Sequence, residues 1–361
     1  MQDLSDKGLN RPPKSAADER LKVTWDVVAG QRVLIYRPRD VAEGEILPCL
    51  VYLHGGGWVS DNPASYDHCI HRVALMVRMM TISVHYRRAP QSPFPAAFDD
   101  CLDVTRHVLQ HGTTLGIDVN RVGLAGDSAG GNLTAAVSLY LRQETNLQLP
   151  PLKYQILMQP VLQAMNLKLP SYIEVGKSNP ITSPSSVAGF WVLYMGLDPK
   201  RADSFVSAVE QNRHRPPELL EKFADYLDTE HLPEKFRRPR PEEMRDSTGI
   251  ETESSTKSYD ADLYAEIQDK LIDPRLCPLM AADVSGLPPT LVLVSEFDVI
   301  RDDGLLFAHR LKQAGVQTQV YVGKGFHGDF YCSFLPDWLG LNSKTGDKMR
   351  EEIREFIQRE H

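Results

Sequence analysis

Several features are absent from this chain of 361 residues, and each absence narrows its class. No run of 18 apolar residues occurs, so we expect no membrane-spanning helix. Residues 1–20 are polar without an apolar core, so we expect no signal peptide in the sequence as given. Basic residues are outnumbered, with 40 Lys and Arg against 48 Asp and Glu, and the net charge is −8. Because no dense basic stripe occurs either, we expect no nucleic-acid partner.

Cysteine is also scarce. The five cysteines are odd in number and never show the C-x-x-C spacing. This pattern favours buried thiols in a reducing compartment over a disulfide framework, and it indicates no metal site. The residues are Cys49, Cys69, Cys101, Cys277 and Cys332.

Strand-like apolar runs alternate with helical patterns along most of the chain. The expected strands are 22–28, 32–36, 47–53, 81–85, 121–125, 154–159, 290–295 and 318–322. The expected helices are 72–80, 94–111, 130–143, 303–314 and 349–360. The first two strands flank Ala29-Gly30 and predict a β-hairpin. The alternation as a whole predicts an α/β fold with a mostly parallel sheet that is covered by helices on both faces.

Between residues 163 and 268 this alternation stops, and prolines, charges and aromatic residues replace it. We expect an insertion folded over the edge of the sheet, because ligands of such sheets bind at the carboxyl ends of the strands. The chain then divides into a first core part (21–162), a cap or lid (163–268) and a second core part (269–361). Residues 1–20 are expected to form an N-terminal segment of the cap.

The most informative motif is the G-x-S-x-G pattern around Ser128, which lies between an expected strand and an expected helix. Glycines two residues either side of a serine permit the sharp turn called a nucleophile elbow. Such a serine needs an imidazole base, a carboxylate that orients the base, and donors for the oxyanion. In this fold the chain order is serine, then acid, then histidine.

His327 is the predicted base, because it lies in a small-residue turn directly after a strand and downstream of Ser128. The other four candidates lie in the insertion, on a helix face or at the last residue: His214, His231, His309 and His361. A non-functional surface histidine is the alternative for His327.

Asp298 is the predicted orienting acid, because it comes at the end of the strand 290–295. Glu296 is the alternative. Asp302 and Asp303 are better explained as the N-cap and first turn of the next helix, where carboxylates satisfy free N–H groups.

The glycine loop Gly55, Gly56 and Gly57 follows a strand, as the HGGG-type oxyanion loops of lipases and esterases do. The expected donors are the N–H groups of Gly56, Gly57 and Ala129, within an oxyanion hole formed by this loop and Ala129. A phosphate-binding loop is the alternative, but the Lys-Ser/Thr of a P-loop is missing. We expect His54 to anchor the loop through a side-chain hydrogen bond.

With these residues in place, the chain closely resembles the hormone-sensitive-lipase-like branch of the α/β-hydrolases, and within it the arylacetamide deacetylase family. The matching blocks are 54–58, 86–90 with 94–97, 126–131, 273–274, 296–304 and 325–328. The resemblance implies an α/β-hydrolase fold with a mostly parallel eight-stranded sheet and a mainly helical cap. It also implies a serine carboxylesterase that forms an acyl-enzyme, needs no cofactor, and hydrolyses small-molecule esters or arylamides of apolar alcohols or amines.

The chain departs from this family in two ways. Val59 and Ser295 stand where the family has cysteines, and the N-terminal signal anchor is missing. Both departures favour a cytoplasmic protein, and the alternative is an endoplasmic-reticulum protein whose anchor is absent from this chain. Two other functions stay open at this point, a non-catalytic small-molecule binder and a peptidase or amidase on the same fold. Physiological substrate, acyl-chain length and oligomeric state are not predicted.

Overall fold

The structure is a computed structural model, and it describes residues 13–42, 44–144, 148–176, 182–238, 259–332 and 344–361. Eight strands form one sheet in the order β1-β2-β4-β3-β5-β6-β7-β8. They are β1 (Leu21–Val28), β2 (Gln31–Pro38), β3 (Leu47–Leu53), β4 (Met80–Val84), β5 (Ile117–Asp127), β6 (Tyr154–Met158), β7 (Thr290–Phe297) and β8 (Thr318–Phe326). In this order, every neighbouring pair from β4 through β3 to β8 is parallel. Strand β2 pairs antiparallel with both of its neighbours, β1 and β4. The predicted mostly parallel, eight-stranded α/β-hydrolase sheet is therefore confirmed.

The predicted hairpin is confirmed as β1 and β2, where Val28 pairs with Gln31. Ala29 and Gly30, with φ of 51° and 80°, make the two-residue turn between them. Positive φ at both central positions is what a type I′ turn requires, and that turn matches the twist of the two strands.

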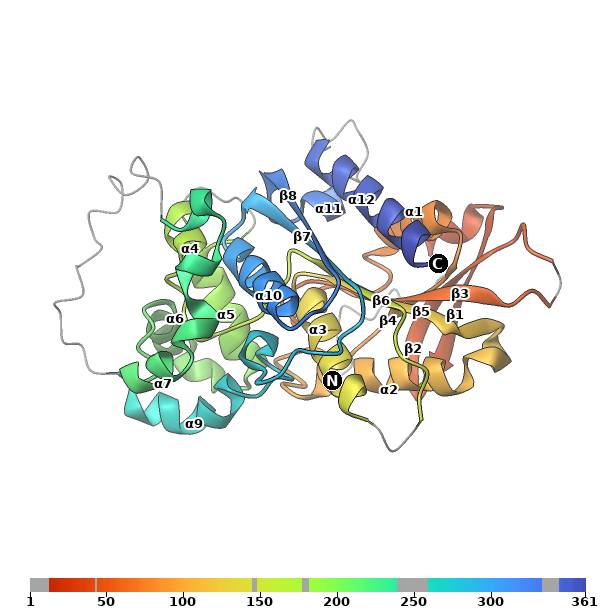
Figure 1. Cartoon of the computed structure of the whole chain (residues 1–361). Coiled ribbons are helices and arrows are strands. Elements are labelled where there is room, and N and C mark those ends of the chain that lie inside the picture. Colours follow the sequence, from red (N-terminus) through yellow and green to blue (C-terminus); the bar gives the residue numbers. More distant parts are fainter. Residues whose placement is uncertain (1–12, 43, 145–147, 177–181, 239–258, 333–343) are drawn as a thin grey trace.

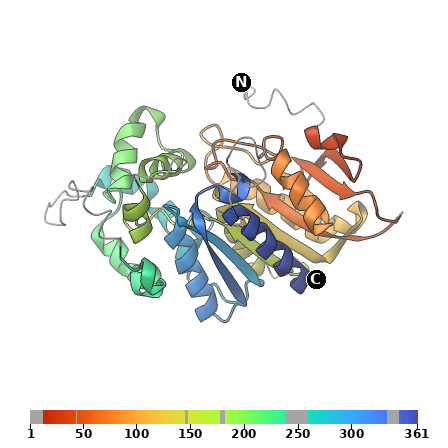
Figure 2. The same cartoon turned by 90° about the horizontal axis from the view of Figure 1, so that it is seen from above.

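Helices cover both faces of the sheet, as predicted (Figures 1 and 2). On one face lie α2 (Ala96–His111), α3 (Ala129–Gln143) and α10 (Arg301–Gln313); on the other lie α1 (Asp67–Val77) and α12 (Lys344–Glu360). Strand β3 shows why two cores form: Val51 and Leu53 join one core, and Leu50 and Tyr52 join the other. Successive side chains of a strand point to opposite faces, so a nearly continuous apolar run buries both.

The insertion is mainly helical, as expected, and Figures 1 and 2 show its helices gathered on one side of the sheet. They are α4 (Pro170–Val175), α5 (Pro184–Tyr194), α6 (Ala202–Glu210), α7 (Pro217–Lys222) and α9 (Ala261–Leu271). The predicted boundary at 268 falls inside α9, so the helical part of the insertion ends at least three residues later.

The N-terminal segment differs from the expectation where the structure describes it. The Ser15 N–H donates to Asp67 of α1 at 3.0 Å, and His71 of the same helix pairs with Asp18 at 2.9 Å. Residues 13–20 thus pack on the core, because these two α1 side chains supply their polar partners. The cap assignment of residues 1–12 lies outside the described residues.

The two ends of the insertion meet at one buried side chain. Asn132 of α3 donates from Nδ2 to the carbonyl oxygens of Val161 and Leu276, at 2.8 and 2.9 Å. Val161 lies just after β6 and Leu276 lies just after α9. The helix that begins beside Ser128 therefore holds both the entry and the exit of the cap.

Cys49, Cys69, Cys101 and Cys277 are buried free thiols, as predicted. Within the ranges that the structure describes, no helix is both long and apolar enough to cross a membrane.

Candidate active site

Ser128 lies at the sharp turn between β5 and α3, with φ 53° and ψ −118°. This conformation is strained for a residue with a side chain, and such strain is typical of functional turns. The close packing around the turn explains the glycines. A Cβ at Gly130 would come 2.6 Å from the His54 carbonyl oxygen and closer still to that of Leu53, and one at Gly126 would overlap Gly130.

The structure brings Ser128, His327 and Asp298 into one hydrogen-bonded chain. His327 Nε2 lies 3.1 Å from Ser128 Oγ, and His327 Nδ1 lies 2.9 Å from Asp298 Oδ2. Asp298 is fully buried, and its other oxygen accepts the Ile300 N–H at 3.1 Å. Each side chain follows the end of a strand of the parallel part of the sheet (β5, β7 and β8), so the three meet at its carboxyl edge.

Burial alone would lower the pKa of His327, but the charge and hydrogen bond of Asp298 outweigh it. The carboxylates of Asp127 and Asp329 act in the same direction, and the pKa is raised above 6.5. The neutral ring that can accept a proton therefore becomes fully populated only above that pH.

The alternative residues do not join this chain. Glu296 faces Lys235 at 3.8 Å. His214 Nε2 lies 2.7 Å from the Ala164 carbonyl oxygen, and His231 and His309 stack on each other with ring centroids 4.2 Å apart. His361 Nε2 lies 3.3 Å from the Tyr154 hydroxyl.

The carbonyl groups of His54, Gly55 and Gly56 are held by hydrogen bonds. The Tyr86 hydroxyl donates to the His54 carbonyl at 2.7 Å, and His54 Nδ1 lies 2.8 Å from the Gly55 carbonyl. The Gly56 carbonyl accepts the N–H groups of Val59 and Ser60 at 3.1 and 2.9 Å. In a trans peptide the N–H points opposite to the C=O, so the N–H groups of Gly56 and Gly57 face away from these partners. Among the described residues, neither group has an acceptor.

Comparison with known proteins decides the family. A sequence model described as the α/β hydrolase fold matches residues 50–227 and 229–331. The chain is 35% identical over 357 residues to the arylacetamide deacetylase of Oryctolagus cuniculus, an alignment that covers 96% of this chain and 82% of that protein. The chain belongs to the arylacetamide deacetylase family of α/β-hydrolases.

This α/β-hydrolase is also 32% identical over 360 residues to neutral cholesterol ester hydrolase 1 of Bos taurus, covering 95% of this chain and 82% of that protein. A solved esterase of Pyrobaculum calidifontis matches with a TM-score of 0.61 and 25% identity, over 96% of this chain and 86% of the other. Its relatives make the protein a hydrolase of the carboxylesterase type.

The Gly55 N–H donates to Asp127 Oδ1 at 3.1 Å, which leaves the N–H groups of Gly56 and Gly57 as the donors expected from the glycine loop. One expectation about the first turn of α10 needs correction. Asp302 is not the N-cap of α10, because that position belongs to Ile300. Asp302 and Asp303 do lie in the first turn, but their carboxylates bond the cap side: Asp302 accepts the Ser171 N–H at 2.7 Å, and Asp303 accepts the Leu162 N–H at 3.0 Å.

The side chain of His54 is buried beside the glycine loop. Its ring stacks on Tyr86 with centroids 4.2 Å apart, and its Nδ1 faces the Gly55 carbonyl. Burial lowers the pKa of His54 to about 3, against the hydrogen bond to Gly55. The ring is therefore neutral throughout the physiological range, which agrees with an anchoring role.

Sequence reasoning missed two neighbours of the site. Asp127 occupies a variable position of the G-x-S-x-G pattern, so the motif assigns it nothing. Phe190 of α5 lies against the Cα of Gly57, where an added Cβ would overlap its ring. In the sequence, Phe190 is one of several aromatic residues of the insertion. The signal that could have singled it out is its place on the same helix as Trp191 and Tyr194, which both pack on Trp58.

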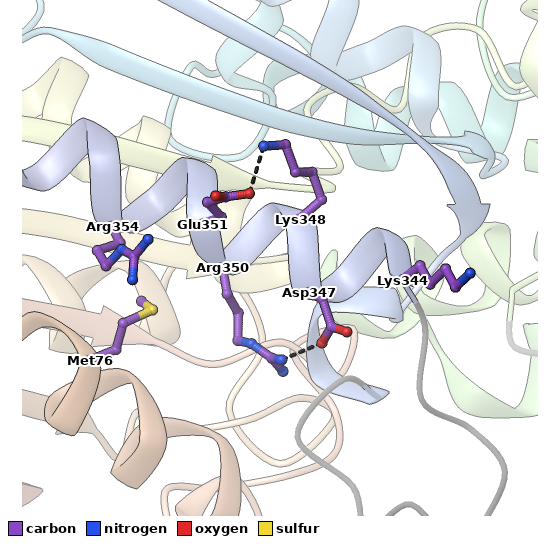
Figure 3. A pocket seen from close by; sticks show the side chains of 7 residues that line it. All are labelled: Met76, Lys344, Asp347, Lys348, Arg350, Glu351 and Arg354. Carbon is purple, nitrogen blue, oxygen red and sulfur yellow. Dashed lines mark hydrogen bonds and ion pairs between the residues drawn. The ribbon is translucent and has the colours of Figure 1, made fainter.

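A separate surface pocket of about 460 Å³ lies between α1 and α12 (Figure 3). Its lining is mostly charged, and Lys348 pairs with Glu351 at 2.6 Å while Arg350 pairs with Asp347. None of the predicted site residues lines it, and the side chains drawn include no nucleophile paired with an imidazole.

Proposed function

We propose that this α/β-hydrolase is a serine carboxylesterase in which Ser128 is the nucleophile, His327 the general base and acid, and Asp298 the orienting carboxylate. The observation that carries the proposal is the hydrogen-bonded chain from Ser128 Oγ through His327 to Asp298, at 3.1 and 2.9 Å. A hydroxyl joined to an imidazole that is itself held by a buried carboxylate is the arrangement that activates serine for acyl transfer.

In the first half-reaction, His327 Nε2 accepts the proton of Ser128 Oγ as that oxygen attacks the acyl carbonyl carbon. The N–H groups of Gly56, Gly57 and Ala129 stabilise the resulting oxyanion. Ala129 is the first residue of α3, so its N–H has no partner within the helix. The protonated His327 then gives its proton to the leaving alcohol as the carbon–oxygen bond breaks, which leaves the acyl group on Ser128.

Water completes the reaction by the same route. His327 removes a proton from water, the hydroxide oxygen attacks the acyl carbon, and Ser128 leaves with the proton from His327. Asp298 stays ionised, holds the Nδ1–H tautomer and stabilises the imidazolium that forms in each half.

The proposed substrates are esters with apolar acyl or alcohol groups, with arylacetamides as a second class. Aromatic side chains beside the glycine loop support the apolar preference, notably Phe190 against Gly57 and Trp58 stacked on Tyr194 at 4.4 Å. The names of the relatives, an arylacetamide deacetylase and a cholesterol ester hydrolase, support both substrate classes.

The test is hydrolysis of nitrophenyl esters of increasing acyl length, with an arylacetamide alongside and Ser128→Ala as the blank. We expect Ser128→Ala to lower kcat by about 10⁴-fold or more while the circular dichroism spectrum is unchanged. Near-full esterase activity in this variant would refute the assignment. The length at which kcat/KM peaks separates a short-chain carboxylesterase from a long-chain ester hydrolase.

A further inference from the structure

Asp127, the residue before the proposed nucleophile, places its carboxylate in the core beneath the glycine loop. Oδ1 accepts the Tyr52 hydroxyl at 2.8 Å and the Gly55 N–H at 3.1 Å, and Oδ2 accepts the Tyr66 hydroxyl at 2.7 Å. A carboxylate buried in this way is costly unless it is well bonded, and three donors meet that need.

One of the three donors differs from the other two. The hydroxyls of Tyr52 and Tyr66 belong to side chains and can rotate, whereas the Gly55 N–H belongs to the backbone of the loop. It can keep its hydrogen bond only if the peptide between His54 and Gly55 stays in place. The next two peptides carry the N–H groups of Gly56 and Gly57.

We propose that Asp127 is a positioning residue that fixes the oxyanion loop relative to the nucleophile, an inference that rests on the proposed esterase function. Its backbone is bonded covalently to Ser128, and its side chain accepts the Gly55 N–H. One residue therefore connects the nucleophile with the oxyanion loop. The pairing of Leu53 with Gly126 brings strands β3 and β5 together up to this point. Asp127, the last residue of β5, continues that registration one residue beyond the end of the β3–β5 pairing.

The shape of the loop fits this role. A Cβ at Gly55 would lie 2.5 Å from Asp127 Oδ2 and 2.7 Å from the Tyr66 hydroxyl oxygen. Only glycine allows the loop backbone to approach the carboxylate so closely. The opposite side of the same residue is held as well, because the Gly55 carbonyl faces His54 Nδ1.

The negative charge of Asp127 has a second, separable effect. It is one of the carboxylates that raise the pKa of His327. Burial raises the pKa of Asp127 itself to about 6, against the hydrogen bonds of Tyr66 and Tyr52. His327 and Asp61 also act on it electrostatically, in opposite directions. Position and charge can therefore be tested apart.

Two substitutions separate them. Asp127→Asn keeps an acceptor oxygen at the same distance but removes the charge, whereas Asp127→Glu keeps the charge but moves the carboxylate by one methylene. Asp67 offers a matched control, because it is also a buried aspartate that accepts a tyrosine hydroxyl, that of Tyr36 at 2.9 Å. Its other bonds go to Ser15 and not to the loop.

We expect Asp127→Glu to lower kcat for a nitrophenyl ester by about 10²–10³-fold, the typical effect of losing an oxyanion donor, with KM within about threefold. Asp127→Asn should keep kcat within about fivefold but move the acid limb of kcat/KM to lower pH, because the charge near His327 is gone. Asp67→Asn and Asp67→Glu should lower the melting temperature and leave kcat unchanged.

Wild-type kcat in folded Asp127→Glu, or an equal loss in Asp127→Asn and Asp127→Glu, would overturn the positioning role. Ser128→Ala in the same assay separates the two proposals. If Ser128→Ala is inactive while Asp127→Glu is fully active, only the positioning role fails. If Ser128→Ala is active, the esterase mechanism itself fails.

Discussion

Phe190 of the cap helix α5 lies directly against the Cα of Gly57 in the glycine loop. The same helix packs Trp191 and Tyr194 on Trp58, with ring centroids 4.6 and 4.4 Å apart. The cap and the loop are thus one packed unit, so a change in either affects the other.

Gly57→Ala is expected to destabilise the protein and to impair catalysis. Gly57 has φ 61°, which costs an L-residue about 1–2 kcal/mol, and the new methyl group would overlap the Phe190 ring. Adding Phe190→Ala should recover the part of the loss due to overlap. The measurement is a double-mutant cycle by urea unfolding, and additive effects would show that the two residues do not interact.

The activity of the enzyme is expected to fall as the pH drops through the raised pKa of His327, because only the neutral imidazole can accept the Ser128 proton. The midpoint of the acid limb of kcat/KM should lie above 6.5. Asp298→Asn removes the main source of the upward shift, so its midpoint should move to lower pH, with kcat down by about 10⁴-fold. A flat profile from pH 5 to 8 would contradict a histidine base.

Asp303 is expected to make stability fall with rising pH. Burial raises its pKa from 3.8 to about 8, against the hydrogen bonds of Gln163 and the Leu162 N–H. Between these two values the folded state holds a proton that the unfolded state has released, so the free energy of unfolding declines as pH rises. Chemical unfolding at pH 5, 6, 7 and 8 measures this slope. Asp303→Asn should flatten it, and an unchanged slope would argue against the shift.

Arg301→Met is expected to cost about 3–5 kcal/mol of unfolding free energy, because it leaves buried carboxylates without their cation. The guanidinium of Arg301 is fully buried between Glu174 of α4, at 3.2 Å, and Asp302, at 2.8 Å. The control is Arg237→Met, which breaks a cap ion pair whose Glu230 partner is largely exposed and should cost about 1 kcal/mol or less. If both variants lost the same unfolding free energy, burial of the Arg301 ion pairs would not account for the effect.

Much of the architecture was predictable because the signals are local. Apolar runs identified all eight strands, and the chain order of Ser128, Asp298 and His327 identified residues that the structure brings together. Helix α1 begins at Asp67, five residues before the expected start, and Cys69 and Ile70 of its first turn already lie on its buried face. Helix α9 was not predicted as a separate element, and the predicted end of the insertion at 268 falls inside it, because the sequence has no clear boundary signal there.

What could not be predicted depends on partners far apart in the chain. The Asp303 carboxylate bonds Leu162, 141 residues away, whereas its local context is that of a first-turn carboxylate. Likewise, the Gly55 N–H bonds Asp127, 72 residues later, and nothing in the run of glycines marks that contact. Side-chain hydrogen bonds leave no periodicity, so a sequence pattern cannot reveal which donor is already occupied.

The hydrogen bonds of Asn132 mean that the cap leaves the core and returns to it at nearly the same place. Since one amide group holds Val161 and Leu276 together, the two chain ends that border the insertion lie within a few ångströms of each other. A segment that leaves and returns at the same point can be lengthened, shortened or swapped between relatives without moving any strand. Substrate range in this family can therefore diversify in one stretch of chain while the strands that carry Ser128, Asp298 and His327 keep their places.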